Sequence, residues 1–157
     1  MLSIHIDLRT ARELLLAAVS QKGADFVAES YDGVCIYAAR DEHGALTPQC
    51  IVGQVFANLG LLGLLVSNGA HIVSGTVPEQ SSACHVGSYV WENLSDAGVH
   101  VTPEAQALFR GTQSKQDRHV PWGEAVEAAV AEYITEAAEK AKEQAERDLG
   151  LSDPNGW

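Results

Sequence analysis

The sequence lacks the features that mark most secreted and membrane-spanning proteins. Its longest apolar run, residues 59–66, is interrupted by Gly60 and Gly63 and is far shorter than the ~20 residues that a membrane-spanning helix needs. The N-terminal segment has no positively charged start and no small-residue cleavage site, so we find no secretion signal. The three cysteines form no C-x-x-C pair, and their odd number argues against a disulfide framework. We therefore expect a cytoplasmic protein that makes no membrane contact.

Patterns of the common catalytic and cofactor sites are also missing. Glycines occur singly, without G-x-G-x-x-G or G-x-x-x-x-G-K-[ST], and there is no G-x-S-x-G elbow. Cysteine and histidine show no paired zinc spacing, and only Cys35 and Cys50 are placed so that two cysteines could approach. We expect no cofactor and no metal.

A thiol nucleophile would need a histidine within reach and a setting that lowers the pKa of the cysteine. Cys50 falls in the first turn of a predicted helix, and Cys84 stands beside His85 at the start of another. Cys50 also belongs to an apolar run, and burial as a small apolar side chain explains such a residue better. A thiol-dependent enzyme stays as an alternative hypothesis.

Positive charge is absent from the middle of the chain. The formal net charge is −11, and no Lys or Arg occurs between Arg40 and Arg110. The acidic residues of that interval are Asp41, Glu42, Glu79, Glu92, Asp96 and Glu104. A negative potential over one pole would repel nucleic acid and favour a basic partner, although the same balance also serves solubility. We take Asp41, Glu42, Glu79, Glu92 and Asp96 as candidate interaction residues.

The segment Tyr31–Gly60 is predicted to organise the fold. Asp32-Gly33 is typical of a hairpin turn, so residues 25–29 and 34–39 are expected to pair as antiparallel strands. The second of these strands is apolar at consecutive positions, which indicates that both of its faces are covered. A helix should follow, capped by Thr47, with Pro48 in its first turn and Gly60 at its end. Gly53 in its middle indicates a close backbone approach.

Several further elements are expected along the chain. Residues 3–7 alternate as a short strand does, and a helix should run from Arg9 to Gly23 with Asp7 or Thr10 as its cap. A short buried helix over 61–66 and a long loop over 67–82 should precede a helix that ends at residues 96–98. Thr102 and Pro103 then open a helix that reaches Arg118.

The last helix begins at Pro121 and carries one apolar stripe. Past Ala137 the stripe narrows to alanine, while Glu136–Lys140 and Glu143–Arg147 have the spacing of i,i+4 ion pairs. Such a helix should project into solvent or pack on a partner, so we add Tyr133, Glu136 and Lys140 to the candidate interaction residues and expect a homodimer through this helix.

Residues 82–94 and 103–118 also allow a helix-turn-helix interpretation. Arg110, Gln113, Lys115, Gln116 and Arg118 could face nucleic acid. The long connection and the acidic surroundings favour an ordinary solvated helix face, so we expect no direct contact with nucleic acid.

Several short stretches resemble one known family. These are residues 23–27, Tyr31–Tyr37, Pro48–Gly53, Gln113, Gln116-Asp117 and Pro121–Gly123. Over residues 10–130 the chain is similar to a family of small uncharacterised proteins of actinobacteria and their phages, and it departs from that family after Ala129. The resemblance implies a cytoplasmic accessory protein. It carries over no catalytic residue.

Together these observations predict an α+β fold, with a small antiparallel hairpin or three-stranded sheet packed by several α-helices and a long C-terminal helix. Residues 1–135 should form one compact domain, and residues 136–157 a charged extension. The function expected is a non-enzymatic acidic protein-interaction module that binds another protein, such as a host factor if the chain is phage-encoded. The alternatives are a nucleic-acid mimic that blocks a DNA- or RNA-binding protein, and the thiol-dependent enzyme.

Overall fold

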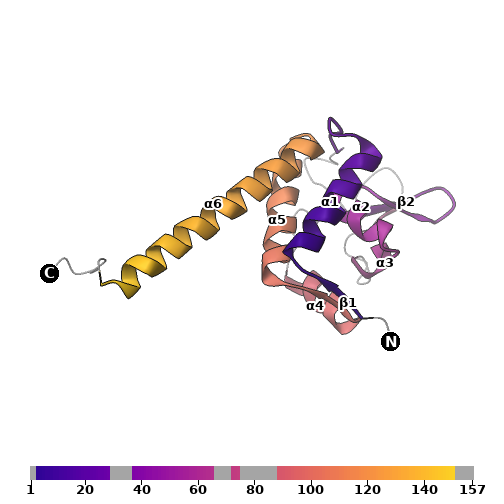
Figure 1. Ribbon diagram of the computed structural model, residues 1–157. Helices are drawn as coiled ribbons and strands as arrows, with labels where there is room; N and C mark the ends of the chain where they lie inside the picture. Colours follow the sequence, from indigo (N-terminus) through magenta and orange to yellow (C-terminus); the bar gives the residue numbers. More distant parts are fainter. Residues whose placement is uncertain (1–2, 29–36, 66–71, 75–87, 151–157) are drawn as a thin grey trace.

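The computed structural model describes residues 3–28, 37–65, 72–74 and 88–150 (Figure 1). The helices are α1 (Leu8–Lys22), α2 (Ile51–Asn58), α3 (Leu62–Leu65), α4 (Ser88–Asp96), α5 (Pro103–Asp117) and α6 (Trp122–Asp148). The strands are β1 (Ile4–Ile6), β2 (Ala38–Arg40), β3 (Leu46–Pro48), β4 (Ile72–Ser74) and β5 (Val99–Val101). The predicted α+β class, with a long C-terminal helix, is confirmed.

The first strand and helix form as their residues indicate. The carboxylate of Asp7 accepts a hydrogen bond from the backbone N–H of Thr10 (2.8 Å) and so caps α1. Gly23 ends the helix with a φ of 95°, a conformation that glycine adopts without strain. Strand β1 pairs in parallel with β5, a strand that the sequence did not reveal. Its residues Val99, His100 and Val101 alternate as those of β1 do, but this short connection between two predicted helices was not assigned a strand.

The predicted pairing of residues 25–29 with 34–39 is wrong in its described part. Residues 25–28 are not a strand, because their segment docks on the start of α6: the carbonyls of Ala24 and Phe26 accept hydrogen bonds from Gly123 (3.0 Å) and Trp122 (2.9 Å). The Asp32-Gly33 turn and Cys35 lie outside the described residues. Strand β2 instead pairs antiparallel with β3 and parallel with β4.

Two boundaries shift as a result. Thr47 and Pro48 belong to β3, where the Thr47 hydroxyl donates to the carbonyl of Ala39 (3.1 Å), so neither opens the helix. Cys50 caps α2 in their place, with its Sγ accepting from the N–H of Gly53 (3.2 Å). The predicted loop over 67–82 contains strand β4, whose β-branched Ile72 and Val73 suit a sheet. The remainder of that loop, with Glu79, lies outside the described residues, and so does Cys84 at the start of the next predicted helix.

The other expected ends are confirmed. Gly60 follows α2 with a φ of 71°, α3 lies within the predicted segment, and Gly98 ends α4 with a φ of 88°. Thr102 caps α5 through a hydrogen bond from the N–H of Ala105 (3.3 Å), with Pro103 in the first turn.

The core lies where α1, α2, α5 and the first half of α6 meet. Its largest fully buried side chains are Trp122, Tyr37, Phe56, Phe109, Ile6, Leu15, Ile51, Leu94 and Leu108. The rest of α6 leaves this body and extends away from it (Figure 1). No helix among the described residues combines the length and the apolar character that crossing a membrane requires.

Candidate interaction surface

The first half of α6 is buried against the rest of the domain, and the second half is exposed. Trp122, Ala125, Val126 and Ala129 are buried against the body, and the ring of Trp122 meets that of Phe26 edge-on with centroids 4.7 Å apart. Lys115 of α5 adds an ion pair to Glu132 (2.6 Å). From Ile134 to Gly150 nearly every side chain is exposed. We call residues 134–150 the arm.

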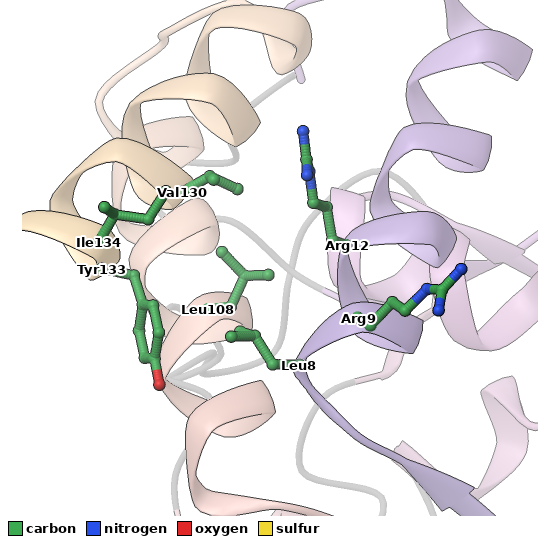
Figure 2. A pocket seen from close by; sticks show the side chains of 7 residues that line it. All are labelled: Leu8, Arg9, Arg12, Leu108, Val130, Tyr133 and Ile134. Carbon is green, nitrogen blue, oxygen red and sulfur yellow. The ribbon is translucent and has the colours of Figure 1, made fainter. Parts of the chain in front are cut away.

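A cleft lies at the point where the arm leaves the body (Figure 2). It has a volume of about 250 Å³. Its lining residues are Leu8, Arg9 and Arg12 of α1, Leu108 of α5, and Val130, Tyr133 and Ile134 of α6. Figure 2 shows Val130, Tyr133 and Ile134 of α6 on one side of the gap and Arg9 and Arg12 of α1 on the other, with the side chains of Leu108 and Leu8 between them. The floor of the cleft is therefore apolar.

The α1 side of the cleft carries the positive charge. The Arg9 Nε lies 3.3 Å from Glu13 Oε1, and both side chains are largely exposed, so this ion pair contributes little. Arg12 has no ion pair within the described part of the chain. In Figure 2 both guanidinium groups point away from the apolar floor. They form a cationic rim rather than a charged interior.

The arm continues the apolar side of the cleft. At ~100° per residue, Val130, Ile134, Ala138, Ala141, Ala145 and Leu149 fall on one side of the helix, and the glutamates of the arm fall on the opposite side. We call Ile134, Ala138, Ala141, Ala145 and Leu149 the alanine stripe. Ile134 is 62% exposed and Leu149 is 72% exposed, the two most exposed large apolar side chains described. An apolar strip this accessible is typical of a binding surface.

The ion pairs predicted along the arm differ from those observed. Among the described residues, Glu136–Lys140 and Glu143–Arg147 form no ion pair; Lys142 and Glu146 approach instead, at 3.9 Å. The Arg147 Nη2 donates to Gln144 (3.1 Å), and the Gln144 amide donates to Asp148 (2.7 Å). These contacts lie on exposed side chains and favour the helix only slightly.

None of the acidic candidates within the described residues lines this cleft. Asp41 is exposed in the turn between β2 and β3, where its carboxylate accepts from the N–H groups of His43 (2.8 Å) and Ala45 (2.9 Å). Glu42 is exposed in the same turn, and Glu92 and Asp96 are exposed on α4. That turn and α4 lie apart in Figure 1. Of the seven candidates that fall within the described residues, only Tyr133 lines the cleft, while Glu136 and Lys140 lie exposed on the arm.

The thiol candidate within the described residues has the wrong environment for a nucleophile. Cys50 is fully buried, and burial raises the pKa of its thiol to about 12. Its sulfur caps α2, while the next N–H, that of Ile51, donates to the buried Gln116 side chain (2.6 Å). Gln113 and Gln116 are also buried, so neither can read a base edge as a helix-turn-helix would require.

Over residues 3–28, 37–65, 72–74 and 88–150, no three His, Cys, Asp or Glu side chains are grouped to hold an ion. Sequence reasoning missed Leu8, Arg9, Arg12, Leu108 and Ile134 as members of the surface. Each looks like an ordinary helix residue until three helices are packed together, and no local signal marks it.

Comparison with known proteins adds no relative: no family model, no curated protein and no solved structure matches this chain.

Proposed function

We propose that this chain is a non-enzymatic protein-binding module whose binding surface consists of the cleft and the alanine stripe. The observation that carries the proposal is the continuity of the two, since the apolar wall formed by Val130 and Ile134 runs directly into the stripe. A groove beside an amphipathic helix commonly binds another helix. The resemblance noted in the sequence would make the partner a host protein if the chain is phage-encoded.

The chemistry of the cleft supports a polypeptide ligand more than a reaction. Its walls are aliphatic apart from the Tyr133 ring, and its two arginines stand at the rim. A helix with an apolar face and an acidic flank would fit this cleft. Its apolar face would pack on the aliphatic walls, and its acidic flank would pair with the two arginines. Small residues along the stripe, chiefly alanine, allow the backbones of two helices to approach closely.

Site-specific photo-crosslinking tests the proposal. A photoreactive amino acid at Ile134 should give a covalent adduct with a polypeptide in the cells that make the protein. The matched control is Thr135, which is also exposed but lies about 100° around the helix axis from Ile134 and outside the alanine stripe; its hydroxyl donates to the carbonyl of Ala131 (3.0 Å). An adduct at Ile134 and none at Thr135 supports the proposal. Equal labelling at both positions, or at neither, contradicts it.

A further inference from the structure

We infer that the occupant of the cleft is the arm of a second copy of this chain, in a symmetric dimer in which each arm lies in the cleft of the other copy. The inference rests on the proposed function, because it names the partner of the same surface. Three features carry it: the register of the stripe, the charge at the two ends of the contact, and the area that a stable dimer requires.

The stripe is complementary to itself when two arms run antiparallel. One register sets Val130 opposite Leu149, Ile134 opposite Ala145, and Ala138 opposite Ala141, and a two-fold axis then repeats the three pairs. In the Val130–Leu149 pair and its two-fold equivalent, the Val130 side chain that lines the cleft contacts the end of the other copy's arm. The exposed Leu149 and Ile134 both become covered. Alanines at the centre allow the close approach that this pairing needs.

Charge is complementary where the arm would end. The C-terminus of α6 presents the unpaired carbonyls and the negative end of the helix dipole, together with Asp148, while Arg147, the basic residue of the last turn, donates to Gln144 (3.1 Å). In the register above this end reaches the cleft of the other copy, whose rim carries Arg9 and Arg12. Arg12 has no ion pair within the described chain, so it is available for this contact.

The area that a stable dimer must bury favours reciprocal exchange of the arms over a simple pairing of two arms. Stable dimers bury at least ~1,200 Å² in total. From Ile134 to Asp148 the arm is only about 20 Å long at ~1.5 Å per residue, and its stripe is mostly alanine, so arm against arm alone buries too little. When the end of each arm lies in the cleft of the other copy, two further apolar contacts are added to the contact between the two arms. The two-fold axis makes these two contacts equivalent, so they form together.

Crosslinking from Leu149 tests the arrangement directly. Within one copy, a straight helix holds Leu149 about 29 Å from Val130 at ~1.5 Å per residue, so the arm cannot reach its own cleft. Purified protein carrying a photoreactive amino acid at position 149 is mixed with ¹⁵N-labelled wild-type protein and irradiated. We expect adducts between the two isotopic forms, mapped to peptides with Leu8, Leu108 or Val130. Adducts confined to one chain, or none, overturn the inference.

A charge placed in the stripe provides the second readout. Ala141→Glu should raise the dissociation constant of the dimer at least tenfold in sedimentation equilibrium, whereas Thr135→Glu, with the same added charge about 120° around the helix axis from Ala141 and outside the stripe, should leave it within about twofold. Both positions are exposed, so the helix content measured by circular dichroism should be kept in both variants. Equal effects of the two variants, or a wild-type protein that sediments as a monomer up to millimolar concentration, contradict the dimer.

The two proposals fail differently. If the purified protein is monomeric and the Ile134 adduct in cells contains a different polypeptide, the second-copy inference is wrong and the protein-binding function stands. If Ile134 gives no adduct in cells and the purified protein is monomeric, both are wrong.

Discussion

At the scale of single residues, Gly53 shows how one backbone position constrains two elements. A Cβ at this position would overlap the carbonyl oxygen of Tyr37, next to β2. We expect Gly53→Ala to lower the free energy of unfolding by about 2–3 kcal/mol, because the overlap is with backbone and cannot be relieved by a side-chain rotation. Urea denaturation measures this change.

The matched control for that substitution is Gly111→Ala in α5. There a Cβ would lie 3.6 Å from the Ala129 Cβ, an ordinary contact. Helix propensity should then prevail and raise the free energy of unfolding by about 0.5–1 kcal/mol. If both alanine variants changed stability equally, the close approach of α2 to Tyr37 would be wrong.

The buried thiol of Cys50 makes stability depend on alkaline pH. Its pKa is raised to about 12 in the folded protein from an ordinary value near 9.0, so the unfolded chain loses this proton first. The contribution is complete below pH 9 and is lost as the pH rises toward 12, by about 1.4 kcal/mol per pH unit. Cys50→Ser keeps a side-chain cap on α2 and removes the titration.

The measurement for Cys50 is the difference between wild-type and serine-variant unfolding free energies from pH 8 to 11. We expect the difference to shift steadily in favour of the variant above pH 9. Thiol alkylation of the folded protein at pH 8 should spare Cys50 as well. A constant difference, together with rapid alkylation, would show that the thiol is accessible and would revive the enzyme hypothesis.

At the scale of elements, the arm and the first half of α6 should differ in their contribution to stability. Side chains beyond Ile134 are almost all exposed, whereas Trp122 and Val126 are buried in the core. Deleting residues 136–157 should leave the unfolding free energy within about 0.5 kcal/mol, measured at a concentration at which the protein is monomeric. Val126→Ala should cost about 1–3 kcal/mol. A large loss of stability on deletion would show that the arm belongs to the core.

Caps and stop signals made several elements predictable. The signals are Asp7 with Gly23 for α1, and Thr102 with Pro103 for α5. Their side-chain or conformational requirements hold in any tertiary context, so both helices follow from local chemistry. The boundary of α2 was predicted wrongly for the opposite reason. Thr47 can cap a helix or join a strand, and only its pairing with Ala39 decides between them.

At the scale of the whole molecule, features that arise from packing between distant segments could not be predicted from the sequence. The Asp32-Gly33 dipeptide matches a hairpin-turn pattern. The segment before it, however, accepts hydrogen bonds from Trp122 and Gly123, which are distant in the sequence, and no local window of sequence reveals such a contact. The cleft has the same origin, because its residues come from three helices. The projecting arm, in contrast, was predictable from the narrowing of its own apolar stripe.

The response of self-association to salt is set by the charge of the whole molecule. Each copy carries a formal charge of −11, so two copies repel at low ionic strength over distances of ~30 Å at 0.01 M salt. The Arg12 rim and the end of the arm attract, but exposed ion pairs contribute only ~0–1 kcal/mol each. We therefore expect the dimer to become tighter as salt rises from about 20 to 200 mM, measured by sedimentation equilibrium. Weaker association would mean that the charged rim, and not the alanine stripe, dominates the contact. A nucleic-acid mimic bound to a basic protein should respond in the opposite way, losing affinity over the same range because attraction between opposite charges is screened.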